Sequence, residues 1–331
     1  MEMEYREYFD SGQTRDAELR KEVLNACLSA VTEKKDIILE SLMQDLGLLK
    51  PECLLYYYSL IEHPLKYAAG FAGNALKPSC EVPRAPYIIS LARTYYNPVG
   101  LVLIDPDPRA PFLHSYAVFL LSLAAGNCTV FRFAGKESAT ASILTEHINK
   151  CIPEGFGRIL FANEECPISV PDLKLGGLDF TEDGEAEAAG RAIAVFDAGA
   201  ELDKNARKVV YAWKKAASLT EIAPEVVLVP TAVRDTFAKN FDKWHRRKSG
   251  MEAPEKLPVI GYTDDEDLWR HLEKEGRPAA LYVFCADGML KDRIVADVPF
   301  VAGCVNGTSM RPPDLKEMRH RLLREKTLTM K

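Results

Sequence analysis

The chain has 331 residues, and its 42 lysines and arginines against 48 aspartates and glutamates give a formal net charge of −6. Hydrophobic residues make up 47% of it, which is ample material for a core and excludes a mainly disordered chain. The mild acidity provides no basic face of the kind that binds nucleic acid, so we expect no nucleic-acid partner. The length predicts two domains or one large one.

Membrane, export and metal signals are not found in the sequence. The longest apolar run covers residues 116–125 and is too short for a membrane span, which needs ~20 residues. The first residues are charged and lack the apolar stretch of a signal peptide. The eight cysteines are scattered, with no pair at CxxC spacing and none beside a histidine at metal-ligand distance. We therefore expect a cytoplasmic protein with free thiols, no membrane span and no metal site.

The first predicted elements are helical. Residues 10–14 (DSGQT) favour a helix start, and apolar residues at helical spacing continue to about residue 47. A second helical pattern covers residues 51–74. Residues 79–96 are rich in β-branched and aromatic side chains and predict a strand or a hairpin.

Short apolar runs then alternate with helical patterns. The runs at residues 99–104, 128–133 and 157–162 are typical of strands that are buried on both faces. The segments 112–125 and 138–150 between them predict helices. Because this alternation produces right-handed parallel crossovers, we predict an α/β fold with a doubly wound, mostly parallel sheet.

The second half repeats the alternation after an acidic stretch, residues 163–192, that has few strand signals. Its predicted strands are 192–196, 225–230, 259–262, 280–285 and 300–306. Its predicted helices are 202–217, 234–248, 264–275, 287–296 and a charged tail, 314–331.

Seven short motifs follow one another along the chain. They are FDSGQTR at 9–15, NPVGLVLI at 97–104, AAGN at 124–127, DAGAELD at 197–203, APEVVL at 223–228, PAALYVF at 278–284 and GCVN at 303–306. In sequence and in order they resemble motifs of the NAD(P)-dependent aldehyde dehydrogenase superfamily, most closely of the branch that acts on fatty and aromatic aldehydes. The resemblance spans roughly residues 9–310.

The resemblance implies a particular domain organisation. Residues 1–205 are expected to form a Rossmann-like cofactor-type domain with a hairpin at about 80–96, and residues 206–310 a smaller, truncated catalytic-like domain. Residues 311–331 are expected to form a charged helix or tail. Because family members usually pair through such a hairpin, the resemblance suggests a homodimer through 80–96, although we expect the C-terminal strand that completes the family's interface to be missing.

The family's catalytic cysteine has no counterpart here. Its motif stands just before an Ala-Pro pair, and alignment on Ala223 and Pro224 puts Glu221 at the cysteine position. A carboxylate cannot form the thiohemiacetal through which the family expels hydride. Cys304 is a poor substitute, because the resemblance makes it a packing residue.

The family's cofactor elements are also altered. The loop at 107–112 lacks the asparagine that stabilises the oxyanion, and the ribose-binding Lys and Glu of the family are lost from the segment that begins at Arg132. Glu182 and Asp183 stand in the phosphate turn, where two carboxylates repel a pyrophosphate. The family's general-base segment and its last conserved segments are missing. We therefore expect no NAD or NADP, with Arg132, Glu182 and Asp183 as vestigial positions.

Three functions remain open. The first is a repurposed non-redox enzyme in which Glu221, at the end of an apolar funnel, is a general acid/base for isomerisation, dehydration or cyclisation of an apolar carbonyl compound. Asp107, Arg109 and His114 are weaker catalytic candidates from the nearby loop. The second is a non-catalytic binding, scaffold or regulatory protein, in which Glu221 is a surface or capping carboxylate of a collapsed site. The third is residual NAD(P)-dependent aldehyde dehydrogenase activity.

Overall fold

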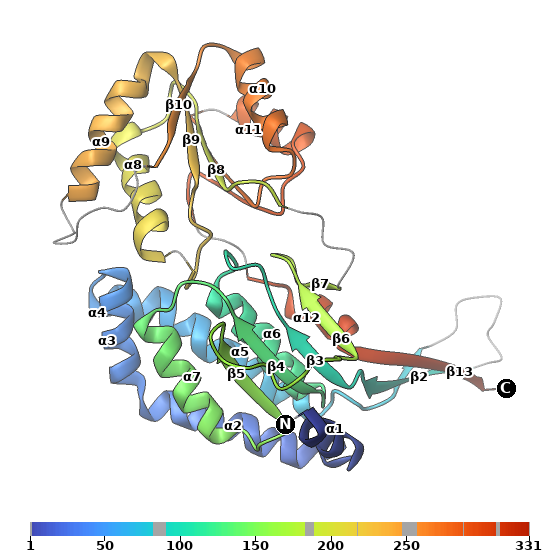
Figure 1. Ribbon diagram of the computed structural model, residues 1–331. Coiled ribbons are helices and arrows are strands. Elements are labelled where there is room, and N and C mark those ends of the chain that lie inside the picture. Colours follow the sequence, from blue (N-terminus) through green and yellow to red (C-terminus); the bar gives the residue numbers. More distant parts are fainter. Residues whose placement is uncertain are drawn as a thin grey trace.

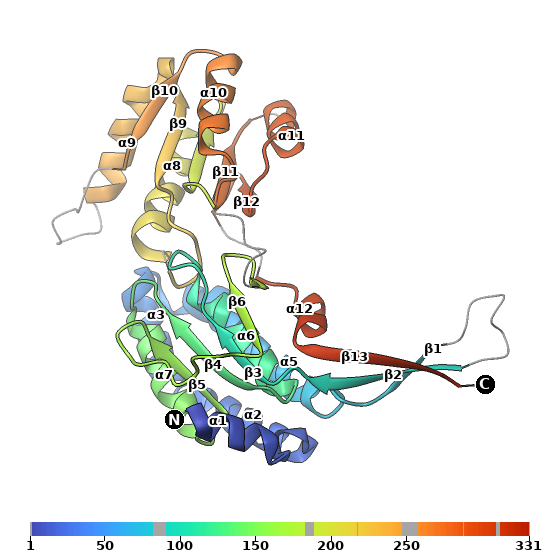
Figure 2. The same cartoon turned by 45° about the vertical axis from the view of Figure 1, so that its right-hand side comes forward.

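The computed structural model describes residues 2–81, 91–182, 189–216, 218–246, 257–286, 288–308 and 312–330, and these form two lobes (Figure 1). The first lobe contains both the N-terminal helices and the C-terminal strand. The second lobe contains residues from the middle of the chain. A three-stranded sheet extends from the first lobe to one side (Figure 2).

The first lobe is built on a five-stranded sheet with strand order β5-β4-β3-β6-β7. Its strands are β3 (Leu101–Ile104), β4 (Cys128–Phe133), β5 (Gly157–Phe161), β6 (Leu173–Gly176) and β7 (Thr181–Glu182). All neighbours are parallel except β6 and β7. The predicted doubly wound, mostly parallel sheet is therefore confirmed. The short strand β6 lies in the acidic stretch that has few strand signals.

The helices of the first lobe pack on this sheet and on one another. They are α1 (Glu2–Asp10), α2 (Ala17–Glu33), α3 (Lys35–Leu46), α4 (Lys50–Glu52), α5 (Tyr58–Ala72), α6 (Phe112–Ala124) and α7 (Ala139–Cys151), with short turns η1 (Gln13–Arg15) and η2 (Cys53–Tyr57). Helix α6 is almost entirely buried, which explains its continuous apolar sequence. The first predicted helix is divided into α2 and α3 at Lys34, where no glycine or proline marks the break. Gly47, with φ 62°, ends α3 in the left-handed conformation that favours glycine.

The second lobe is a parallel sheet of order β10-β9-β8-β11-β12. Its strands are β8 (Ile193–Phe196), β9 (Val226–Pro230), β10 (Val259–Tyr262), β11 (Ala280–Phe284) and β12 (Ala302–Val305). Helices α8 (Leu202–Tyr211) and α9 (Arg234–Arg246) pack on one face, and α10 (Asp265–Glu275) and α11 (Gly288–Asp297) on the other. A short π-helix, η3 (Ala212–Ala216), follows α8, and a short 3₁₀-helix, η4 (Thr231–Val233), follows β9. Strand β8 belongs to this sheet although it precedes residue 205.

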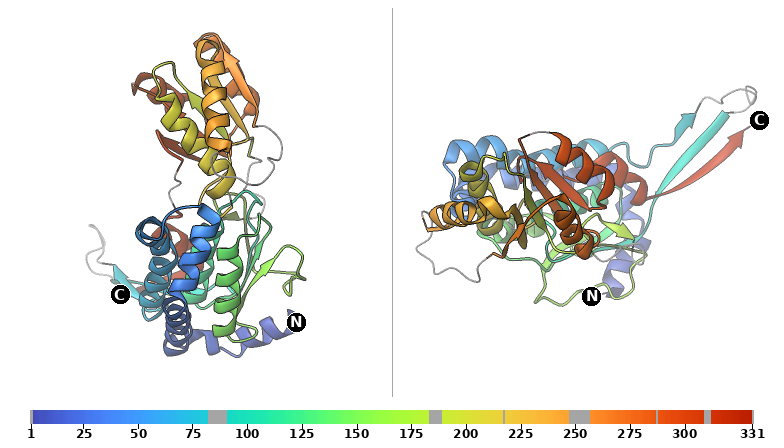
Figure 3. Two further views of the ribbon diagram at one scale, coloured as in Figure 1. Left: turned by 90° about the vertical axis from the view of Figure 1, so that its left-hand side faces the viewer. Right: turned by 90° about the horizontal axis from the view of Figure 1, so that it is seen from above.

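The third sheet shows an error in the prediction for the C-terminal segment. It has the order β1-β2-β13, with β1 (Ser79–Glu81), β2 (Leu91–Pro98) and β13 (Leu323–Met330) all antiparallel. The tail is therefore a short helix, α12 (Leu315–Arg321), followed by a strand, and the C-terminal strand that we expected to be missing pairs with β2 along its whole length. Residues 82–90 of the expected hairpin lie outside the described residues. Seen from above, this sheet projects well beyond both lobes (Figure 3).

No helix among the described residues is long and apolar enough to cross a membrane.

Candidate functional site

Glu221 lies on a tight turn between the two lobes. The backbone N–H groups of Phe112 and Leu113, at the start of α6, donate to the carbonyls of Ser218 (2.7 Å) and Leu219 (3.1 Å). The Ser218 N–H in turn donates to the Glu221 carbonyl at 3.2 Å, and Ser218 has a φ of 68°. The helix start, which lacks intrahelical acceptors, therefore holds this turn in place.

The Glu221 carboxyl is buried, with 3% of the residue exposed. Burial raises its pKa to about 7, and a hydrogen bond with Thr308 opposes the rise. Its Oε2 atom has no hydrogen-bond partner among the described residues. Glu221 is therefore a buried carboxyl, not a surface one, and it can take up a proton near neutral pH.

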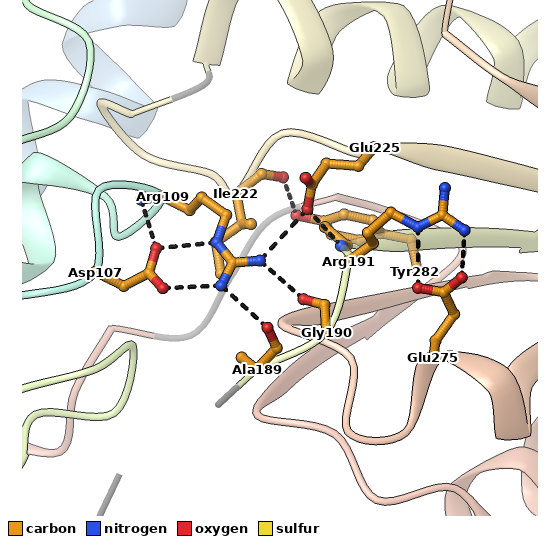
Figure 4. Close-up of polar contacts among 10 residues, drawn as sticks. Asp107, Arg109, Ala189, Gly190, Arg191, Ile222, Glu225, Glu275 and Tyr282 are labelled. Atoms are coloured by element: carbon orange, nitrogen blue, oxygen red, sulfur yellow. Dashed lines mark hydrogen bonds and ion pairs between the residues drawn. The ribbon is translucent and has the colours of Figure 1, made fainter. Parts of the chain in front are cut away.

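Phenol groups lie near enough to this carboxyl to feel its charge. Burial and the charge of Glu221 raise the pKa of both Tyr57 and Tyr211, whose hydroxyls are joined by a 2.9 Å hydrogen bond. Tyr282 donates to the Ile222 carbonyl at 2.6 Å (Figure 4), and its pKa is also raised. The phenols therefore stay neutral, and no ion pair with a described residue compensates an ionised Glu221.

A cavity of about 310 Å³ reaches Thr220, the chain neighbour of Glu221. It lies between α5, α6 and residues 312–316, and Thr220 is part of its lining, whereas Glu221 is not. His114, from the first turn of α6, also lines it. Burial lowers the pKa of His114 to about 4, so its imidazole is neutral at physiological pH.

The other two weaker candidates, Asp107 and Arg109, form a clasp between the lobes (Figure 4). Arg109 donates to both carboxylate oxygens of Asp107 (2.9 and 2.8 Å) and to the carbonyls of Gly190 (2.8 Å) and Ala189 (3.3 Å), and its Nη1 lies 3.5 Å from an oxygen of Glu225. Burial acts to raise the pKa of Asp107, but the hydrogen bonds and charge of Arg109 outweigh it and hold that pKa below its ordinary value. Within the described residues, no hydrogen bond or ion pair joins this clasp to Glu221.

Glu225 and Arg191 complete the polar contacts on the second-lobe side of the clasp. Glu225, just before β9, accepts the Ala192 backbone N–H at 2.9 Å. Arg191 pairs with Glu275 at the end of α10 (Figure 4). The sequence suggested neither role.

A second hollow of about 450 Å³ lies at the carboxyl ends of β3, β4 and β6. Asp105 and Arg132 line it from the first lobe and are joined by a hydrogen bond of 2.9 Å and an ion pair. Arg277 lines it from the second lobe. Open parallel sheets bind nucleotides at this edge. A guanidinium suits a phosphate and a carboxylate suits ribose hydroxyls, so the residues present fit a dinucleotide.

The remaining sequence candidates lie apart from this hollow. Glu182 ends β7 and is exposed, and Asp183 lies outside the described residues. Cys304 lies on β12 and packs against the core of the second lobe. Thr220 and Thr308 were missed from the sequence. Thr220 could have been found as the neighbour of Glu221, whereas Thr308 reaches the site only through the fold.

Curated relatives share a common description. No family model matches the chain. An aldehyde dehydrogenase of Craterostigma plantagineum is 22% identical over 67% of this chain, which spans half the length of that relative. A 4,4'-diaponeurosporen-aldehyde dehydrogenase of Staphylococcus aureus is 20% identical over 92% of this chain and 83% of its own length.

Solved structures share the fold. The substrate-bound AldH of Staphylococcus aureus has a TM-score of 0.70 at 16% identity, covering 99% of this chain and 93% of that one. The NADP-dependent glyceraldehyde-3-phosphate dehydrogenase of Bacillus halodurans C-125, complexed with NADP, has a TM-score of 0.68 at 15% identity, covering 99% and 90%. Our expectation of no NAD or NADP is wrong, because structures of this fold are complexed with NADP or NAD+ and point to NAD(P) use. The curated relatives and solved structures consistently point to the aldehyde dehydrogenase superfamily, in which this chain is short.

Proposed function

We propose that the protein is a non-redox acid/base enzyme that acts on a small apolar carbonyl compound, with Glu221 as the proton carrier. The observation that carries this proposal is the state of Glu221: its carboxyl is buried, one oxygen lacks a partner among the described residues, and its pKa is raised to about 7. A group whose pKa lies near the working pH populates both its acid and its base form, which favours proton transfer.

The chemistry requires only proton movement. Ionised Glu221 accepts a proton from the carbon next to a carbonyl group, and the same carboxyl then returns it to another carbon or to an oxygen. The outcome is an isomerisation, a dehydration or a cyclisation, and no electrons are exchanged with the enzyme. No thiol takes part, in agreement with the packing position of Cys304.

The test begins with a search for activity, by comparing metabolites with and without the protein in its native host. Glu221→Gln keeps the shape of the side chain but removes its titratable proton, and we expect it to reduce turnover by about 10²–10⁴-fold. Cys304→Ser is the control and should leave turnover nearly unchanged. An activity that survives Glu221→Gln but is lost with Cys304→Ser contradicts the proposal. A folded protein without any activity favours a binding or scaffold role instead.

A second candidate function is NAD(P)-dependent oxidation of an aldehyde, which the dinucleotide complexes of the fold favour. The hollow at the ends of β3, β4 and β6 would hold the cofactor, where Arg132 would suit a phosphate and Asp105 a ribose hydroxyl. When bound, the dinucleotide supplies a hydride acceptor. Calorimetric titration with NAD and NADP tests this: we expect micromolar binding that Arg132→Leu weakens about tenfold. Absence of binding contradicts it.

The sheet β1-β2-β13 supports a further proposal, that two copies of the chain pair through this region. Strand β13 is at the sheet's edge, and an unpaired edge of eight residues is a template for another strand. Analytical ultracentrifugation should find a dimer that a chain ending before Leu323 does not form. A monomeric full-length chain would contradict this pairing.

A further inference from the structure

Two helices of the first lobe, α2 and α7, pack against each other, and each presents a cysteine at the contact (Figure 1). The buried face of α2 carries Val23 and, one turn later, Cys27. The buried face of α7 carries Leu144 and Ile148, and Cys151 continues this stripe three residues later. The two cysteines therefore meet in one hydrophobic cluster, although they are more than a hundred residues apart in the sequence.

The side chains of these two cysteines interact directly. A hydrogen bond joins the Cys27 thiol to the Cys151 sulfur. The Cys151 thiol also donates to the His147 carbonyl at 3.3 Å, which fixes its position at the end of α7. Both cysteines are free. Two thiols within hydrogen-bond reach on packed helices need little backbone movement to form a disulfide.

The two thiols differ in exposure and in acidity. Cys27 is fully buried, whereas Cys151 is partly exposed. The hydrogen bond from Cys27 lowers the pKa of Cys151 to about 7, against the opposing effects of burial and of the Glu33 charge. The same hydrogen bond, together with burial, raises the pKa of Cys27. Cys151 is thus an accessible thiolate beside a protonated thiol, an arrangement typical of a redox-sensing cysteine and its resolving partner.

The pair is separate from the sites described above and is not part of a metal site. Neither cysteine lines the hollow at the ends of β3, β4 and β6 or the cavity beside α6. Across the described part of the chain, no group of three or more histidine, cysteine, aspartate or glutamate side chains could hold a metal ion. The chemistry left to two adjacent thiols is their oxidation to a disulfide.

We propose that Cys27 and Cys151 are an oxidation site, at which hydrogen peroxide converts the two thiols into a disulfide between α2 and α7. The Cys151 thiolate attacks one peroxide oxygen and the O–O bond breaks, which gives a sulfenic acid, while the other oxygen takes up a proton and leaves as water. The Cys27 thiol then loses its proton and attacks the Cys151 sulfur. The S–S bond forms, the S–O bond breaks and a second water leaves. The two sulfurs are oxidised, and the peroxide is reduced.

The disulfide should stabilise the first lobe. It closes a loop that contains α3, α5, α6 and the strands β3 and β4. A cross-link of this kind limits the conformations of the unfolded chain, and its effect grows with the length of the loop. We expect the oxidised chain to melt about 3–8 °C above the reduced chain.

Treatment of the full chain with hydrogen peroxide, followed by peptide mapping without reduction, tests this. Trypsin places Cys27 on peptide 22–34 and Cys151 on peptide 151–158, and neither peptide has another cysteine. The two peptides should appear cross-linked, with the mass of two hydrogen atoms lost. Dithiothreitol should release them and return the melting temperature to that of the reduced chain.

Variants separate the roles of the two thiols. In Cys27→Ser the hydroxyl still donates to Cys151, so oxidation should stop at the sulfenic acid, which dimedone labels. Cys27→Ala removes the donor and should slow this labelling about tenfold at pH 7. Cys151→Ser should give neither label nor cross-link. Cys166→Ser is the matched control, because Cys166 is also partly exposed in the first lobe, and it should cross-link as the native chain does.

Cross-links that join other cysteines, sulfinic acid at Cys151 without a cross-link, or a native chain whose thiols all stay free under peroxide overturn the inference. Equal dimedone labelling of Cys27→Ser and Cys27→Ala also contradicts it, because the hydrogen bond then has no effect on Cys151. If the cysteine variants fail to fold, the peptide map of the native chain decides the outcome.

Discussion

The hollow at the ends of β3, β4 and β6 and the cavity beside α6 differ in how their polar residues are partnered. In the hollow, Asp105 pairs with Arg132, and in the clasp next to it Asp107 pairs with Arg109. At the cavity, the Thr220 hydroxyl and an oxygen of Glu221 lack partners among the described residues. Partnered charges resist titration, whereas a buried carboxyl without a cation is neutralised near physiological pH.

The pKa values of Asp107 and Glu221 illustrate this difference. The pKa of Asp107 is below its ordinary value because Arg109 outweighs the effect of burial, and the pKa of Glu221 is raised to about 7 because burial outweighs its single hydrogen bond with Thr308. An acidic residue in the sequence therefore does not reveal its chemistry. The surroundings of the residue determine its pKa. The clasp and the turn that carries Glu221 should therefore respond differently to pH and to salt.

The largest expected effect on stability is at Glu221. Its folded-state pKa of about 7 lies above its ordinary 4.5, so folding stability is full below about pH 4.5 and is lost as pH rises to 7. Glu221→Gln does not ionise and should gain up to about 3 kcal/mol over the native chain between pH 4 and pH 8. Urea unfolding at both pH values measures this difference. An equal difference at the two pH values would mean that Glu221 ionises freely.

His114 should give an effect of opposite sign. Its folded-state pKa of about 4 lies below its ordinary 6.5, so stability is full above pH 6.5 and is lost as pH falls toward 4. His114→Asn should reduce the loss of folding stability at low pH by about 2 kcal/mol. This value is discounted because the ring is partly exposed. Thermal unfolding at pH 7 and pH 4.5 provides the comparison. Identical acid sensitivity of variant and native chain would show that His114 is solvated.

Breaking the clasp should cost less and should depend little on pH. Arg109→Ala leaves the half-buried Asp107 without its cation and removes two bonds to backbone carbonyls, so we expect a loss of about 1–3 kcal/mol. Lys150→Ala, which breaks an exposed pair with Glu146 on α7, is the control and should cost about 0–1 kcal/mol. Guanidinium unfolding at pH 7 measures both. Equal losses would argue against a special role for the clasp.

The smallest effect on stability is expected for the ion pair in the hollow at the ends of β3, β4 and β6. The Arg132 side chain is 37% exposed, so its pair with Asp105 should contribute about 0.5–1 kcal/mol or less. Arg132→Leu should therefore lower the melting temperature slightly at low salt and by less at 1 M salt, since salt screens exposed pairs. Scanning calorimetry at two salt concentrations checks this. A large decrease in melting temperature that salt does not change would show that this pair behaves as a buried ion pair.

The sequence by itself determined most strands of the two five-stranded sheets and the mostly parallel character of the fold. Continuous apolar runs such as 99–104 and 128–133 predict strands that are covered on both faces, and β3 and β4 are buried accordingly. Alignment on Ala223 and Pro224 also gave Glu221 as a candidate site residue, because a short local motif keeps its order along the chain. The clasp and the hydroxyls of Thr220 and Thr308 were not predicted, since their importance depends on residues distant in sequence.

Only the tertiary structure decided the conformation of the C-terminal segment and which residues meet at the candidate site. The charged C-terminal segment has a local pattern that suits a helix, yet β13 forms because β2 offers it eight consecutive partners. Likewise, the convergence of His114 and Thr220 follows from backbone hydrogen bonds between α6 and a turn more than a hundred residues later in the sequence. Local propensity fails at such places, because strand pairing and burial are properties of contacts between distant segments.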